Sequence, residues 1–272
     1  MREKMSSEEL AWRIRRHGIE MTHVSHGSHI ASVLSAAEIV AVLYNEVMHV
    51  GPELVDDEER DRFILSKGHA SAAVYAALAE KGFFPVEELV TQEQDGSRIS
   101  GHISRNGLPG VEFSTGSLGH GLGVGAGLAL AAKEDGAQHR VFVVLGDGEC
   151  EEGSVWEAAL FAHHYSLANL VATVDHNHMQ AMGTCEEVAS LAPLGDKWRA
   201  FGWHVQEVNG NDIGELRQAY AHLSQEQPNC IIAHTVKGKG ISFMENQLLW
   251  HYHDPQGEEY ERAVAELEAH RP

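Results

Sequence analysis

The sequence predicts an α/β fold in which helices cover both faces of a doubly wound, mostly parallel β-sheet. Two observations indicate this class. Short apolar runs typical of buried strands alternate along the chain with segments of helical periodicity. No linker, internal repeat or low-complexity segment interrupts the 272 residues. We therefore expect a single domain over 1–272.

The apolar runs and the helical periodicity predict where the strands and helices lie. Strands are clearest at 141–145, 170–174 and 230–234, and weaker at 63–65 and 204–208. Helical periodicity predicts helices over 7–17, 36–47, 71–81, 118–133, 156–166, 212–224 and 258–269. Ser35 and Glu38 have the spacing of a capping box, which would satisfy free backbone N–H groups at the start of the second helix.

Charge and cysteine content exclude several classes of partner. Forty acidic residues against twenty basic ones give a net charge of -20, so we expect neither nucleic acid nor an anionic membrane as a partner. Cys150, Cys185 and Cys230 have no paired spacing, which indicates a reducing compartment. The charged N-terminus lacks the apolar core of a signal peptide, and we expect a cytoplasmic protein.

One uncharged segment is long enough to cross a bilayer. Residues 113–132 carry no formal charge over 20 positions, but they include six glycines. We therefore expect a packed interior helix behind a glycine-rich loop rather than a membrane span. The 19 histidines show no HExxH motif and no Cys/His cluster with zinc spacing.

Polar loops follow four of the predicted strands, and they indicate where a ligand binds. Their sequences are SKGHAS after Leu65, GDGECEEG after Leu145, DHNHMQ after Val174 and TVKGKG after His234. In parallel α/β sheets, ligands sit beyond the carboxyl ends of the strands. These loops are therefore the expected site.

Asp147 and Asn177 are the first candidates for a chemical role. They lie 30 positions apart, the length of one strand–helix–strand unit, so neighbouring parallel strands would bring a carboxylate and an amide oxygen together. Oxygen ligands of this kind suit Mg²⁺ or Ca²⁺. The alternative is structural: Asp147 caps the next helix and Asn177 makes a turn.

Longer motifs resemble the transketolase family, whose cofactor is thiamine diphosphate. Gly146-Asp147-Gly148, followed after 28 residues by Asn177, resembles the thiamine diphosphate signature. Four segments look like transketolase blocks in the right order: SHIASVLSAAEI (28–39), ERDRFILSKGHAS (59–71), GHISRNGLPGVEFSTGSLGHGLGVGAGLALA (101–131) and GDGECEEGSVWEAALFA (146–162). The sequence departs from the family at His120, where glutamine is usual, and at 28–30, where Ser-His-Ile replaces Gly-His-Pro.

The resemblance implies a role for individual residues of the metal and diphosphate site. Asp147 and Asn177 match the metal ligands, and Met179 matches the residue that offers its backbone carbonyl. Gly148 matches a backbone contact to the diphosphate, which the N-terminus of a helix nearby would favour. His69 matches a histidine close to the diphosphate and thiazolium.

Other positions match the rest of the cofactor and the substrate channel. Gly116 and Leu118 match the loop that meets the aminopyrimidine, and Glu152 and Glu157 match acidic positions near the family's dimer interface. We expect Glu152 among the catalytic residues and Glu157 among the cofactor contacts. The expected catalytic histidines are His29, His69, His102 and His251, with His251 also touching the cofactor and His253 as its alternative.

The resemblance also implies a function and a partner. We expect transfer of a two-carbon ketol unit from a ketose or ketose phosphate to an aldose. The pyrimidine-binding domain that completes such a site is absent from this sequence, so we expect a C-terminal partner chain and an assembly of two copies of each.

Three other functions remain open at this point. One is pyruvate decarboxylation and carboligation of the deoxyxylulose-phosphate synthase type, because His120 resembles that branch too. A second is a partnerless, non-catalytic binding module. The third is a nicotinamide dehydrogenase, but the glycines of 119–127 do not form G-x-G-x-x-G.

Overall fold

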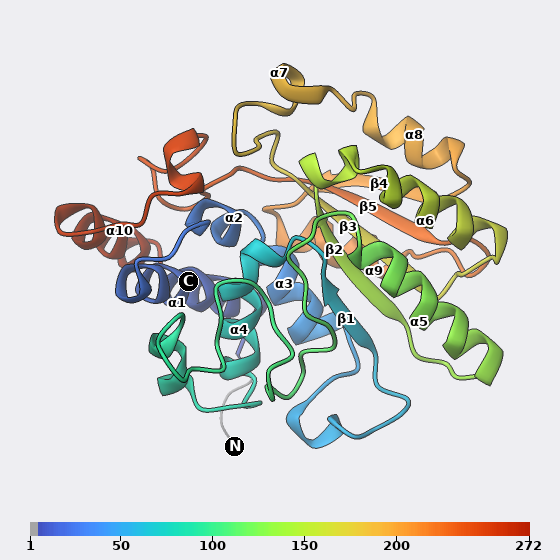
Figure 1. Cartoon of the computed structure of the whole chain (residues 1–272), viewed down its shortest axis with the longest axis horizontal. Helices are drawn as coiled ribbons and strands as arrows, with labels where there is room; N and C mark the ends of the chain where they lie inside the picture. The colour runs from blue at the N-terminus through green and yellow to red at the C-terminus, as the bar shows by residue number, and fades with distance from the viewer. Residues whose placement is uncertain (1–4) are drawn as a thin grey trace.

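A parallel sheet forms the centre of the molecule in the computed structural model, which describes residues 5–272 (Figure 1). Within these residues five strands lie in the order β1-β2-β3-β5-β4, and every neighbouring pair is parallel. The strands are β1 (Arg62–Leu65), β2 (Val141–Gly146), β3 (Leu170–His176), β4 (His204–Asn209) and β5 (Asn229–His234). All five strands expected from the sequence are therefore present.

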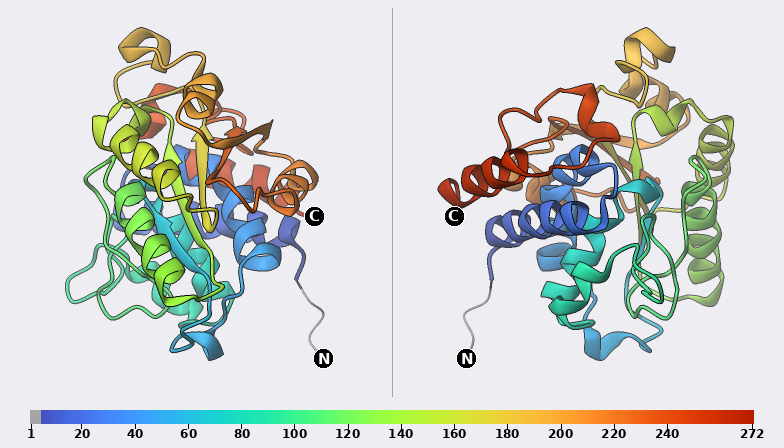
Figure 2. Two further views of the ribbon diagram at one scale, coloured as in Figure 1. Left: turned by 90° about the vertical axis from the view of Figure 1, so that its right-hand side faces the viewer. Right: turned by 60° about the vertical axis from the view of Figure 1, so that its left-hand side comes forward.

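Helices cover both faces of this sheet, as expected for a doubly wound fold (Figure 2). One face packs against α1 (Ser7–Ser25), α2 (Ile30–Ser35), α3 (Ala37–Val42), α4 (Ser71–Glu80), α9 (Ile213–Ala221) and α10 (Glu258–Ala269). The other face packs against α5 (Gly121–Asp135), α6 (Gly153–His164) and α8 (Leu194–Ala200). The short helix α7 (Cys185–Ala189) has no buried residue.

Both faces of the strands are apolar because each strand supplies side chains to two cores. Phe142 and Val144 of β2 belong to the core under α1–α4, whereas Val143 and Leu145 belong to the core under α5 and α6. Side chains alternate between the faces of a strand, so a strand that is buried on both sides reads as an unbroken apolar run. This is why the apolar runs of the sequence locate the strands.

The N-terminal helices differ most from expectation. The helix expected over 7–17 extends to Ser25, and the one expected over 36–47 is divided into α3 and a π-helix, Leu43–Val47, with α2 before it. The predicted capping box is wrong. Ser35 Oγ donates to Asp175 Oδ2 at 2.6 Å, and Glu38 pairs with Arg15 at 2.6 Å. Buried polar partners from other elements compete with the local cap.

The uncharged segment 113–132 forms a loop and then α5. The helix buries one side only, with Leu122, Gly125 and Ala126 against the sheet while Gly123 and Gly127 are exposed. A Cβ on Gly125 would lie 2.5 Å from Val143 Cγ2, so glycine is what allows α5 this close to β2. Among the helices of residues 5–272, none has the length and hydropathy needed to cross a membrane.

Candidate active site

A cavity of about 520 Å³ opens beyond the carboxyl ends of β1, β2, β3 and β5. It is lined by loops that follow these strands, by the start of α2 and by the 3₁₀ helix Leu248–His251. The structure brings nearly all the predicted site residues together here: His29, His69, His102, Gly116, Leu118, Asp147, Gly148, Glu152, Asn177, Met179 and His251. Glu157 is not among the lining residues.

Asp147 and Asn177 lie at one corner of the cavity, on neighbouring strands. Gly146 at the end of β2 pairs in register with Asp175 of β3, so the residues that follow them lie side by side. Asp147 Oδ1 accepts from the N–H of Gly148 at 2.8 Å, and Oδ2 accepts from the N–H of His178 at 2.6 Å. The capping role thus exists, and it leaves lone pairs on both oxygens.

The charge of this corner suits a cation. Burial and then the nearby carboxylate of Asp175 raise the pKa of Asp147, although its N–H partners act in the opposite direction. No salt bridge to Asp147 exists among residues 5–272. The carbonyl of Met179 accepts from Lys237 Nζ at 3.1 Å and keeps a second lone pair. The residues present therefore fit a small divalent cation with oxygen ligands.

Lys67 and Asp175 form a buried ion pair under the floor of the cavity. Their side chains are 1% and 0% exposed. Asp175 also accepts from Ser35 Oγ at 2.6 Å and from Thr235 Oγ1. Burial alone would raise the pKa of Asp175, but Lys67 and these donors outweigh it and hold the pKa below its ordinary value. This pair joins the loop after β1 to β3 and, through Thr235, to the loop after β5.

A second buried lysine, Lys237, faces into the cavity. Its Nζ lies 3.0 Å from His251 Nδ1, and burial, followed by the charge of Lys67, lowers its pKa to about 8. The cavity thus has a lysine charge beside the candidate metal corner. That arrangement suits a diphosphate, whose oxygens can bridge a cation and an ammonium.

Four histidines form one wall of the cavity, with His29 at their centre. The ring centroid of His29 lies 5.1 Å from that of His69, 5.7 Å from that of His102 and 4.9 Å from that of His251. Burial, aided by neighbouring cationic groups, lowers the pKa of His29 to about 4, lowers that of His251 to about 3, and takes that of His69 well below its ordinary value.

These pKa values make His29, His69 and His251 neutral at pH 7. Neutral imidazoles offer one donor and one acceptor nitrogen each, which suits the hydroxyl groups of a sugar. Nδ1 of His29 is buried and has no hydrogen-bond partner among residues 5–272. An unpaired buried nitrogen costs free energy, so a ligand that bonds to it gains affinity.

The two candidate histidines near the C-terminus, His251 and His253, lie in different surroundings. His251 is 9% exposed and lines the cavity, and its carbonyl accepts from the N–H of His29 at 2.8 Å. His253 instead lies against the ring of Trp250 and is hydrogen-bonded to Glu259 at 2.8 Å. His251 is therefore the one that faces the cavity.

Acidic residues near the cavity differ in what they do. Glu149 is buried, and its carboxylate accepts from Ser66 Oγ and from the N–H groups of Gly119 at 2.8 Å and Gly146 at 3.0 Å. It fastens the loop containing Gly116 and Leu118 to the sheet. Glu152 is exposed at the edge of the cavity. Glu157 is exposed on α6, where it lies outside the cavity.

Several residues that line the cavity were not predicted from the sequence, and Lys67 and Lys237 are the most important of them. Both lie in the polar loops that follow strands, SKGHAS and TVKGKG. What the sequence did not reveal is that both ammonium groups are buried. A lysine directly after a strand that is buried on both faces is the signal that could have found them.

The cavity beyond the parallel sheet has residues that fit a phosphorylated ligand and a divalent cation. Comparison with known proteins agrees: the profile of the transketolase thiamine diphosphate-binding domain matches residues 6–263. The chain therefore belongs to the transketolase family. Its fold class and its cofactor, thiamine diphosphate, are those expected from the sequence.

The fraction of its length that this chain covers differs from one relative to another. An apulose-4-phosphate transketolase subunit of Phocaeicola vulgatus is 42% identical over 255 residues, 93% of this chain and 90% of the relative. The 6-deoxy-6-sulfo-D-fructose transketolase subunit SqwG of a Clostridium species is 43% identical over 242 residues, 88% of each. The structure of Leishmania mexicana transketolase superimposes with a TM-score of 0.88 at 31% identity, covering 98% of this chain. The chain spans 42% of that protein.

Proposed function

We propose that this chain supplies the diphosphate and metal half of a transketolase, which transfers a two-carbon ketol unit from a ketose to an aldose. One observation carries the proposal: a single cavity joins the oxygen ligands Asp147 and Asn177 to the neutral histidine wall. A cofactor held at the first would present its reactive end to a sugar held at the second.

Each part of the cavity has a proposed role in holding the cofactor. Asp147, Asn177 and the carbonyl of Met179 hold the metal, and Lys237 with the N–H of Gly148 holds the diphosphate. When bound, thiamine diphosphate supplies the carbon nucleophile and electron sink of ketol transfer. Its aminopyrimidine would lie toward the loop that carries Gly116 and Leu118 (both at the cavity).

The histidines have the proposed catalytic roles. His29, His69, His102 and His251 would hydrogen-bond the sugar hydroxyls and hold protons at their ring nitrogens. Because His29, His69 and His251 are neutral at pH 7, each has a ring nitrogen that can accept a hydrogen bond from a hydroxyl. Glu152 stands at the edge of the cavity, where it would meet the partner chain.

A partner chain is part of the proposal. The buried carboxylates in and beneath the cavity already have partners: Asp147 with two N–H groups at the proposed metal corner, Asp175 with Lys67, and Glu149 with the glycine loop. Tyr252, which lines the cavity, is 65% exposed, and Leu249, in the 3₁₀ helix just before it, is 61% exposed. Exposed apolar side chains beside a polar site suit a protein interface.

That partner would carry the pyrimidine-binding domain and the acid that activates the cofactor, and the assembly would hold two copies of each chain. Three relatives that match along most of both chains are named as subunits, which supports this arrangement. Their names also support a ketose with an anionic group at the far end as the donor. Three free cysteines support the cytoplasm as the compartment.

Reconstitution tests the proposal. The purified chain, given thiamine diphosphate, Mg²⁺ and a ketose phosphate with an aldose acceptor, is expected to show no ketol transfer. Adding the C-terminal partner should produce turnover, because the missing acid is then present. The partner alone is the control.

Two results would contradict this account. Sustained turnover by the isolated chain would mean that it holds a complete site. Activity of the complex with pyruvate but not with ketose donors, read from CO₂ release and product analysis, would favour the carboligase alternative.

A further inference from the structure

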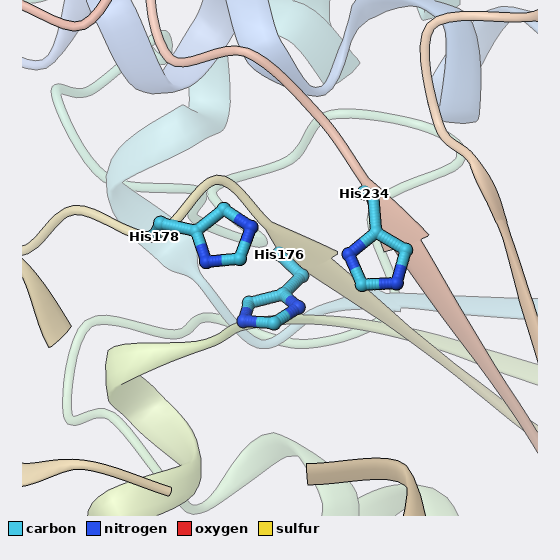
Figure 3. A group of neighbouring side chains, drawn as sticks. All are labelled: His176, His178 and His234. Carbon is cyan, nitrogen blue, oxygen red and sulfur yellow. The ribbon is translucent and has the colours of Figure 1, made fainter. Parts of the chain in front are cut away.

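Three histidines meet at the carboxyl ends of β3 and β5, outside the cavity described above (Figure 3). His176 ends β3 and pairs in register with His234, which ends β5, and His178 follows two residues after His176. The ring centroid of His176 lies 4.0 Å from that of His178 and 5.0 Å from that of His234. One ring nitrogen of each histidine lies within 4.8 Å of the other two.

The course of the chain after β3 separates this cluster from the cofactor site. Asn177 and Met179 line the cofactor cavity, whereas His176 and His178 line a second cavity of about 570 Å³. The chain leaves β3 at His176 and takes a left-handed conformation at His178 (φ 65°), so one short segment serves two cavities. Asp147 lies between the two cavities and lines both.

The hydrogen bonding of the cluster is incomplete. Nδ1 of His176 is buried and has no hydrogen-bond partner among residues 5–272. Nε2 of His234 lies 3.3 Å from Glu207 Oε2, a carboxylate that also lines the second cavity. A metal ion would satisfy the free nitrogen, and Glu207 is placed either to orient His234 or to complete the coordination.

We propose that His176, His178 and His234 bind a divalent transition-metal ion, with Zn²⁺ as the preferred occupant. Three imidazoles and a fourth ligand form a common zinc arrangement, in which Zn–N distances of about 2.0–2.1 Å place the nitrogens about 3.4 Å apart. His178 is exposed, so its ring can turn to close the remaining distance. Water or Glu207 supplies the fourth ligand.

The donor set separates this ion from the one at Asp147. Imidazole nitrogens favour Zn²⁺, Ni²⁺ and Cu²⁺, whereas Mg²⁺ and Ca²⁺ prefer oxygen ligands. Excess Mg²⁺ should therefore leave the histidine site available. The bound ion would tie the end of β3 to the end of β5.

The test is a zinc titration of the tag-free chain in complex with its C-terminal partner. The complex is first treated with chelator and then saturated with Mg²⁺ and thiamine diphosphate. Calorimetry should show one zinc bound per copy of this chain, and Co²⁺ in place of zinc should give the visible absorption bands of nitrogen-ligated, four-coordinate cobalt. Absence of zinc binding by the wild-type complex would overturn the proposal.

Substitutions of the proposed zinc ligands test where the ion binds. His178→Gln and His234→Gln should each weaken zinc binding by more than the roughly 10- to 100-fold that loss of an outer-shell partner costs. His204→Gln, in β4 but outside the cluster, is the matched control and should bind zinc as the wild type does. Asp147→Asn should also retain zinc. Equal affinity in the wild type and both cluster variants, or loss of zinc in Asp147→Asn alone, would contradict the proposed ligands.

Discussion

Replacing Asp147 with asparagine is expected to abolish magnesium-dependent retention of thiamine diphosphate while leaving the chain folded. The substitution keeps the shape of the side chain but removes the charge from a proposed metal ligand, which is 5% exposed and without an ion pair among the described residues 5–272. The amide oxygen can still accept one of the two N–H groups, from Gly148 or from His178, so the chain should remain folded. Asn177→Ala should have the same effect on the cofactor.

Melting of the complex with its partner chain measures this effect. At a cofactor concentration one hundred times the dissociation constant, binding stabilises the wild type by about 2.7 kcal/mol. A hundredfold weaker variant at the same concentration would gain only about 0.4 kcal/mol. Asp135→Asn, an exposed change of the same charge on α5, is the control. Unchanged affinity and magnesium dependence in either cavity variant would rule out the assigned ligands.

Replacing Lys67 with methionine is expected to lower the free energy of unfolding by about 3–5 kcal/mol, because it leaves Asp175 as an unpaired buried charge. The two side chains are at most 1% exposed, so water cannot take the place of the ammonium. The hydroxyls of Ser35 and Thr235 remain as donors but carry no positive charge. Urea denaturation of the isolated chain gives the value directly.

Two further variants separate charge burial from packing. Lys67→Met combined with Asp175→Leu should recover much of the loss, because no lone charge is then buried. Lys239→Met breaks the exposed pair with Glu245 and should cost at most about 1 kcal/mol. A loss for Lys67→Met no larger than that for Lys239→Met would show that the buried pair contributes little.

The fold could be predicted largely because buried parallel strands appear in the sequence as apolar runs. β1, β2, β3 and β5 correspond to such runs, whereas the edge strand β4 is partly polar, and the loops that follow these four strands locate the cavity. Short helices were harder. The helices α7 and α8 have five and seven residues, too few for periodicity to stand out.

The site residues form two groups: those that a sequence motif identifies and those whose role depends on burial. Motif residues such as Asp147 and Asn177 could be assigned because the signature fixes their spacing. Lys67 and Lys237 could not, because their importance comes from burial, which only the packed structure determines.

The histidine cluster could not be predicted from the sequence. His176 and His178 are close in the chain, but His234 comes from a distant strand, and no zinc spacing marks the three. The pairing of β3 with β5 is what brings them together.

Parallel melts with and without thiamine diphosphate and Mg²⁺ test the shared site most directly. We expect the complex with the C-terminal partner to gain about 2.7 kcal/mol at one hundred times the dissociation constant. The isolated chain, whose cavity we propose to supply only the diphosphate and metal half, should gain much less. Equal shifts in the two samples would mean that this chain holds the cofactor by itself, and that result would contradict the shared site.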